Sequence, residues 1–112
     1  MTEEEKRQQR AALLLQYEET REELQYLRNK AWNLSEDIGE ISHWLREARE
    51  ALATAHERER EQARDKNIQE NVSHYRLAFD FDALLALRED LRRANDKLRE
   101  LAKQKNDLGL GA

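Results

Sequence analysis

The sequence predicts an all-α protein, a long helical hairpin or coiled coil, from three observations. Apolar residues recur at alternating steps of three and four through the first half of the chain, which is the a/d pattern of a coiled coil. Charged residues make up 39% of the 112 residues and aromatic residues 6%, which disfavours a globular core of ordinary proportions. The chain has no proline and only three glycines, which favours long uninterrupted helices.

The first expected element is a long N-terminal helix within residues 1–66. Thr2 and Glu5 form a T-x-x-E capping box, so the helix can begin almost at the terminus. A single helix cannot bury a narrow apolar stripe, so the stripe must pack on another helix or on a second chain. With Leu24 as heptad position a, this seam comprises Leu24, Leu27, Leu34, Ile38, Ile41, Leu45 and Leu52.

An alternative architecture is a three-helix bundle with a break near 32–36. Ser35 is followed by two acidic residues, which resembles an N-cap with an acidic first turn. Gly39 also weakens a helix locally, by about 1 kcal/mol. Against a break, the seam keeps its phase from Leu34 to Ile38, whereas a loop would normally reset it. A continuous helix is therefore the favoured prediction.

Residues 67–80 form the expected connecting segment, with a possible short β segment near 73–80. Apolar side chains alternate there with other residues in a pattern typical of a strand: Tyr75, Leu77, Phe79 and Phe81. Ile68, Val72 and Tyr75 are instead spaced for a helix, so both interpretations remain open. A lone strand would need a partner strand, from a second copy or from another protein.

A C-terminal helix is expected over 81–107, with Asp80 as its N-cap. Residues 108–112 are expected to form a flexible tail, and residues 1–112 a single coiled-coil domain. The second helix continues the seam with Leu84, Leu87, Leu91, Leu98 and Leu101.

The sequence contains no convincing catalytic or metal-binding motif. Glu40 and His43 form an E-x-x-H pair, the spacing used in di-iron helical bundles, but no second such pair exists in the chain. Both residues fall at heptad positions that face away from the seam. The absence of cysteine excludes disulfides and thiolate metal sites. We therefore expect no enzyme activity, no metal and no cofactor.

Two tryptophans are the most informative candidates for contacts. Trp44 falls at heptad position g, where it would cover the edge of the seam, whereas Trp32 falls at position b. We expect Trp32 either to be covered by a further helix or to contact a partner. The candidate partner contacts are Tyr26, Trp32, Tyr75, Leu77, Phe79 and Phe81.

The expected function is that of a non-catalytic interaction protein, an adaptor, scaffold or chaperone-like subunit that self-associates as a homodimer and binds a protein partner. No apolar run has the length of a membrane span, and the acidic N-terminus does not resemble a secretory signal, so a cytoplasmic location is expected. The alternative is a nucleic-acid-associated accessory protein using the basic residues of the C-terminal helix. Acidic residues interleave with those basic residues, so nucleic-acid binding is the less favoured prediction.

Overall fold

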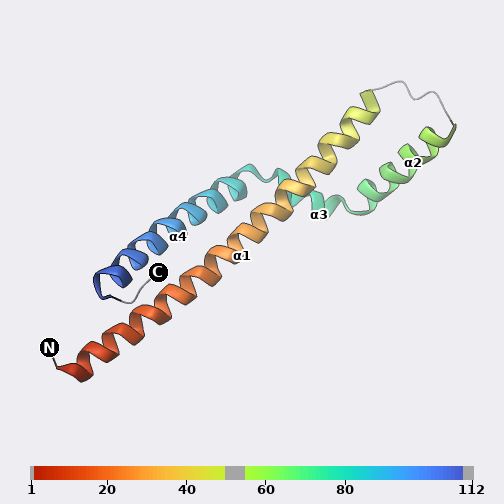
Figure 1. Ribbon diagram of the computed structural model, residues 1–112. Helices are drawn as coiled ribbons and strands as arrows, with labels where there is room; N and C mark the ends of the chain where they lie inside the picture. The colour runs from red at the N-terminus through yellow and green to blue at the C-terminus, as the bar shows by residue number, and fades with distance from the viewer. Residues whose placement is uncertain (1, 50–54, 110–112) are drawn as a thin grey trace. The chain divides into compact units, whose positions relative to one another are not determined.

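The computed structural model describes residues 2–49 and 55–109, and every regular element in these ranges is helical (Figure 1). No strand occurs in the described ranges, so the predicted all-α fold class is confirmed. In chain order the elements are α1 (Glu3–Arg49), α2 (Ala55–Glu70), α3 (Val72–Arg76), the 3-10 turn η1 (Leu77–Phe79) and α4 (Phe81–Asp107).

Helix α1 begins with the predicted capping box and continues without a break through Ser35. The Glu5 amide donates to Thr2 Oγ1 at 3.1 Å, and the Thr2 amide donates to Glu5 Oε2 at 3.3 Å. The Ser35 hydroxyl donates to the Trp32 carbonyl at 2.9 Å, so it bonds to the preceding turn of helix instead of capping a new one. The alternative bundle with a break near 32–36 is therefore wrong.

The prediction of one helix through residue 66 is also wrong. Helix α1 is described to Arg49, and α2 begins at Ala55 and lies antiparallel to the last part of α1. Two contacts define this pairing, one from Asp65 to Trp44 and one from Arg64 to Glu47. Residues 50–54 contain neither proline nor glycine, so the sequence carries no breaker that would have placed the end of a helix there.

The segment 67–80, expected to connect the two long helices with a possible short β segment near 73–80, contains no strand and is helical except at Asn71 and at the extended Asp80. Helix α2 continues through Asn67 to Glu70, and Asn71 interrupts it with φ −116° and ψ 25° before α3 and η1 follow. The buried residues are Ile68, Tyr75 and Ala78, which are seven and three residues apart, as on one face of a helix. A helix satisfies its backbone hydrogen bonds locally, whereas an isolated strand would leave its N–H and C=O groups unpaired.

Helix α4 occupies the range expected for the C-terminal helix. Asp80 is extended, with φ −80° and ψ 95°, and its Oδ1 accepts the Ala83 amide at 3.1 Å, as expected of an N-cap. After the last turn Gly109 adopts φ 71°, a left-handed conformation suited to glycine at a helix C-terminus. The expectations for Leu52 and for residues 110–112 lie outside the described residues.

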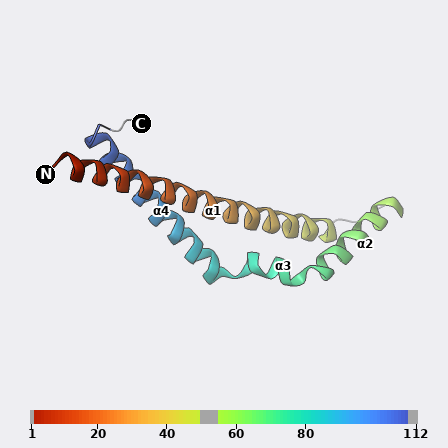
Figure 2. The same cartoon turned by 90° about the horizontal axis from the view of Figure 1, so that it is seen from below.

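The contacts within the chain divide it into two units, and the first consists of Met1–Asn29 with Ala86–Ala112. Here α4 lies antiparallel to the first part of α1, as the two views in Figures 1 and 2 agree. Leu24 lines a shallow groove together with Leu98, and the Lys105 ammonium lies 4.1 Å from the centre of the Tyr17 ring. The buried residues of this unit are Leu13, Thr20, Leu24, Leu27, Leu87, Ala94 and Leu101.

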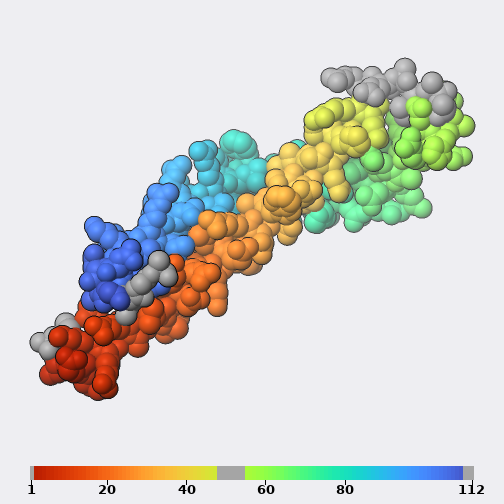
Figure 3. Space-filling model, in the orientation of Figure 1, coloured from red at the N-terminus to blue at the C-terminus, as the bar shows by residue number. Residues whose placement is uncertain are grey.

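The core of unit 1 is therefore a leucine seam with one polar member. Thr20 is buried at a seam position, and its hydroxyl donates to the Gln16 carbonyl at 2.8 Å, so the buried oxygen is satisfied. Full burial of each leucine contributes about 1.5–3 kcal/mol before entropy costs. In Figure 3 the atoms of α4, in blue, lie directly against the red and orange atoms of α1.

The second unit consists of Lys30–Leu85 and has a different kind of core. It contains the last part of α1, all of α2, α3 and η1, and the start of α4. Only Ile68, Tyr75 and Ala78 are buried among its described side chains. Hydrogen bonds and ion pairs between side chains also join its helices, and these are described next.

Candidate functional site

The predicted seam residues divide into three groups. The first group is buried within the single chain and comprises Leu24, Leu27, Leu87 and Leu101. The second group is half-buried and comprises Leu34, Ile41, Leu84, Leu91 and Leu98. Ile38 and Leu45, both at heptad position a, remain 36% and 58% exposed. Leu52 lies outside the described residues.

One of the predicted partner-contact residues is buried within the chain, and the others are exposed. Tyr75 is only 8% exposed, so it belongs to the core of unit 2 and not to a contact surface. Trp32 is 66% exposed, so the expectation that a further helix covers it is wrong for the described part of the chain. The others are also exposed, namely Tyr26, Leu77, Phe79 and Phe81.

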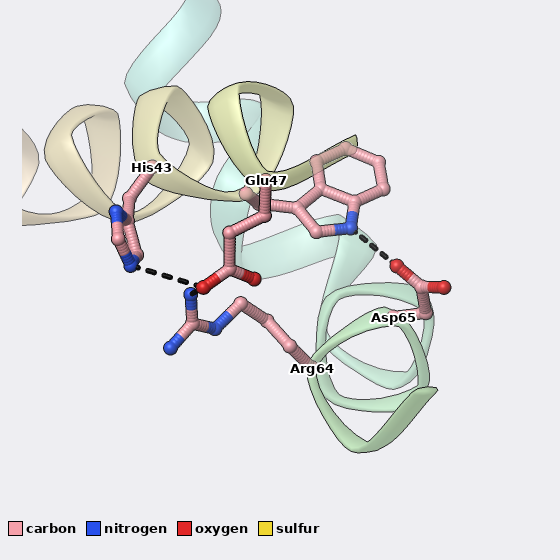
Figure 4. Close-up of polar contacts among 5 residues, drawn as sticks. His43, Glu47, Arg64 and Asp65 are labelled. Atoms are coloured by element: carbon pink, nitrogen blue, oxygen red, sulfur yellow. Dashed lines mark hydrogen bonds and ion pairs between the residues drawn. The ribbon is translucent and has the colours of Figure 1, made fainter. Parts of the chain in front are cut away.

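A polar cluster joins α1 to α2 in unit 2. The Trp44 indole Nε1 donates to Asp65 Oδ1 at 2.6 Å. Nearby, Glu47 Oε1 accepts from the Arg64 guanidinium and lies 3.2 Å from Nε2 of His43 (Figure 4). Glu47 is therefore a shared acceptor for a side chain of its own helix and one of α2. Trp44 is half-buried, as expected of position g, and its indole N–H donates to a carboxylate.

A second polar cluster joins α1 to α3. His74 Nε2 lies 3.0 Å from Asp37 Oδ2, and the Asp37 side chain is only 15% exposed. The Tyr75 hydroxyl donates to Glu40 Oε2. This hydrogen bond to a carboxylate raises the pKa of Tyr75 above its ordinary value of 10.0, and burial of the hydroxyl adds to the effect because it disfavours the phenolate.

These contacts use a face of α1 that differs from its seam. Asp37 and Trp44 occupy heptad position g, and Glu40 and Glu47 occupy position c. The seam positions a and d of the same segment form no hydrogen bond or ion pair, since their side chains are aliphatic. In unit 2 the helices are therefore attached beside the apolar stripe and leave part of it open.

A groove of about 450 Å³ runs along this polar interface. Its walls mix both charges, with Glu36 and Glu40 from α1 facing Arg64 from α2. The remaining lining residues are Ser35, Gly39, His43, Asn67 and Ile68. Within the described ranges, no three His, Cys, Asp or Glu side chains are grouped so that they would hold a metal ion.

Basic residues of α4 are paired with acidic or aromatic neighbours at two places. Arg92 lies 3.4 Å from Glu89 on the same helix, and Lys105 lies over the Tyr17 ring. Neither arrangement presents a cluster of uncompensated positive charge of the kind that phosphate backbones attract. No helix in the described ranges has an apolar stretch long enough to cross a membrane.

Sequence reasoning missed the polar interface almost completely. Arg64 and Asp65 fall within the expected first helix with no predicted partner, and Glu40 and His43 are expected to face away from the seam. The only signal for Trp44 was its heptad position, which indicated partial burial but not a partner. The pairing depends on α2 lying beside the last part of α1, and residues 50–54 contain no proline or glycine from which the end of the first helix could have been predicted.

Comparison with known proteins found no matching family model, no significantly similar curated protein and no significantly similar solved structure.

Proposed function

We propose that this protein is a non-catalytic helical interaction protein, an adaptor, scaffold or chaperone-like subunit, that self-associates and binds a protein partner. One observation carries the proposal. Leu77, Phe79 and Phe81 lie within five residues of sequence and are 63%, 55% and 70% exposed. Leu85, four residues further along, is also more than half exposed.

Exposed aromatic and aliphatic side chains of this size support a binding role. Phenylalanine and leucine side chains in water lose the free energy that burial would provide, about 1.5–3 kcal/mol each when burial is complete. Concentrated apolar exposure on a soluble chain typically marks a site of interaction. The neighbouring carboxylates of Asp80 and Asp82 favour a partner whose apolar surface is bordered by basic residues.

Self-association has separate support in α1. Ile38 and Leu45 continue the heptad pattern but are left exposed when α2 and α3 attach to the neighbouring face. An aliphatic stripe at heptad spacing is the surface that a second helix covers in a coiled coil. A homodimer would supply that helix from an identical chain.

Two measurements on the full chain test the proposal. Light scattering over a range of concentrations is expected to give a mass that rises from the 13.3 kDa of one chain towards twice that value. A mass of one chain at every concentration would remove self-association from the proposal.

Partner binding is tested with variants of the exposed segment. The double variant Phe79→Ser/Phe81→Ser is compared with Leu15→Ser, which alters an exposed leucine in unit 1. Proteins from the source cell that bind the wild type and Leu15→Ser, but not the double variant, are the expected result. Capture that is identical for all three chains would contradict a role for the exposed segment.

A further inference from the structure

We propose that residues 31–45 of α1 form an antiparallel homodimer interface whose two-fold axis passes between Gly39 and Glu40. This inference deepens the proposed function, and rests on it, by specifying which surface self-associates and in which orientation. The argument starts from what remains uncovered on α1 in unit 2. Ile38 and Leu45 are exposed, while Leu34 and Ile41 between and beside them are half-buried.

The elements of unit 2 that contact this part of α1 do so from another side. Their hydrogen bonds and ion pairs go to Asp37 and Trp44 at position g and to Glu40 and Glu47 at position c. Positions a and e lie on the opposite flank of the helix from position c. A second helix can therefore approach the apolar stripe without displacing these described contacts.

The chemistry of the open face restricts what can cover it. Between residues 31 and 45, no side chain at positions a, d or e is charged. The a and d positions are aliphatic, and the e positions are Ser35 and Ser42. Apart from the Arg46 guanidinium, which donates to Ser42 Oγ at 3.2 Å at the edge of this face, a strongly charged partner would find little to pair with. An equally neutral aliphatic helix would bury the a and d side chains without desolvating a charge at those positions. The chain's own segment has these properties.

An antiparallel register matches the segment with itself. With the axis between Gly39 and Glu40, Leu34 packs against Leu45 of the second copy, and Ile38 against Ile41 of the second copy. The two-fold axis repeats both pairs, which gives four consecutive layers of leucine on leucine and isoleucine on isoleucine. On the flank formed by the e positions, Ser35 lies near Ser42 of the second copy, so no like charges oppose each other on that flank.

The extent of the open segment selects this orientation over a parallel one. The part of α1 that belongs to unit 2 runs from Lys30 to Arg49, and its midpoint lies between Gly39 and Glu40. In this antiparallel register the two α1 helices overlap only over residues 30–49, because residue 30 of one copy lies opposite residue 49 of the other. A parallel α1 in register would continue past residue 30, where the seam residues Leu24 and Leu27 are already buried within unit 1.

The orientation is tested by cross-linking, because the chain contains no cysteine that would compete. Chains carrying Ser35→Cys and chains carrying Ser42→Cys, distinguished by different tags, are mixed and treated with a short bifunctional maleimide. In the antiparallel register, residue 35 of one copy and residue 42 of the other lie two residues apart along the helix axis, roughly 3 Å. Residue 35 of one copy and residue 35 of the other lie nine residues apart, roughly 13 Å. Mixed cross-links between the two tagged chains are expected to predominate.

Predominance of cross-links between identical positions would overturn the antiparallel orientation. The surface itself is tested by the variants Ile38→Glu and Leu45→Glu. Both positions are exposed in the single chain, so the helicity measured by circular dichroism should be unchanged. Each variant is expected to raise the dissociation constant of the dimer, measured by light scattering, at least about tenfold, because the carboxylate would be buried in the interface. Leu15→Glu, an equally exposed leucine in unit 1, is the matched control.

The outcomes separate this inference from the proposed function. If the wild type dimerises and both Ile38→Glu and Leu45→Glu dimerise equally well, the protein self-associates through a different surface and the inference fails alone. If the wild type stays at the mass of one chain, self-association fails and the inference fails with it. Partner capture through the segment 77–81 is measured independently of either result.

Discussion

The indole of Trp44 and the carboxylate of Asp65 are joined by a hydrogen bond of 2.6 Å, although 21 residues separate them in the sequence. The bond connects α1 to α2 about one helical turn along α1 from Glu40, which accepts from the Tyr75 hydroxyl. Because the acceptor is a carboxylate, the bond belongs to the stronger class of charge-assisted hydrogen bonds. It fixes both the pairing of the two helices and the half-buried position of the indole.

The variant Asp65→Asn should lower the free energy of unfolding by about 1 kcal/mol, because it keeps an acceptor oxygen but removes its charge. Urea denaturation followed by tryptophan fluorescence measures the change. A Trp32→Phe background leaves Trp44 as the only tryptophan in the chain. Asp96→Asn makes the same chemical change at an exposed site on α4 and should have little effect. Equal effects of the two variants would contradict the assigned bond.

The leucine seam of unit 1 predicts a large contrast between two leucines of α1. Leu24 is almost fully buried, so Leu24→Ala should lower the free energy of unfolding by about 2–5 kcal/mol through lost burial and the cavity left behind. Leu15 is largely exposed, and Leu15→Ala should change the free energy by less than about 1 kcal/mol. Denaturation followed by circular dichroism measures both. Comparable losses would mean that the seam is not the core of unit 1.

The raised pKa of Tyr75 predicts a loss of stability at alkaline pH. The folded state holds the phenolic proton more tightly than the unfolded state, so the stabilisation is present below the unfolded pKa of 10.0 and declines as the pH rises through and above it. Tyr75→Phe has no phenolic proton and escapes this decline. The free energy of unfolding of Tyr75→Phe should therefore fall further below that of the wild type at about pH 8 than at about pH 11.

Urea denaturation at both pH values provides the measurement for Tyr75. Other groups that titrate at alkaline pH are present in both chains, so their contributions largely cancel in the difference. Tyr26→Phe, at an exposed tyrosine, controls for the loss of a phenolic hydroxyl and should change the free energy of unfolding little at about pH 8. A constant deficit for Tyr75→Phe would contradict the effect of Glu40 on this hydroxyl.

The two described glycines should respond in opposite ways to alanine. Gly39 lies inside α1, and a Cβ added there would meet nothing within 4 Å, so Gly39→Ala should stabilise the protein by about 0.5–1 kcal/mol. Gly109 has φ 71°, where an alanine is strained, so Gly109→Ala should be neutral or destabilising. Thermal denaturation distinguishes the two. Destabilisation by Gly39→Ala would indicate that this position has a neighbour that the single chain lacks.

Periodicity was enough to predict the helices and the core of unit 1. The seam that contains Leu24 is apolar at steps of three and four, and this pattern has one structural interpretation when it extends over several turns. Asp80 was equally predictable, because an aspartate followed by an apolar helical pattern is typical of an N-cap, and its carboxylate does accept the Ala83 amide. Both features depend on residues close together in the sequence.

Features of unit 2 were harder to predict because they depend on tertiary pairing. The alternation of Tyr75, Leu77 and Phe79 satisfied the strand pattern, yet no neighbouring strand exists among the described residues to make a strand stable. The resulting helical turns bury Tyr75 and expose the other two. The hydrogen bond from Trp44 to Asp65 likewise requires α2 to lie beside α1, which heptad position alone cannot indicate.

Each unit is stabilised internally by different chemistry, and this difference affects how each responds to thermal fluctuation. Unit 1 relies on a buried leucine seam, whereas the described hydrogen bonds and ion pairs between α1 and its neighbours in unit 2 depend on a few carboxylates. Amide protons of α2 and α3 should therefore exchange with deuterium well before those at the centre of α4. Such an order of exchange would mean that α2 and α3 open transiently while the leucine seam of unit 1 remains folded.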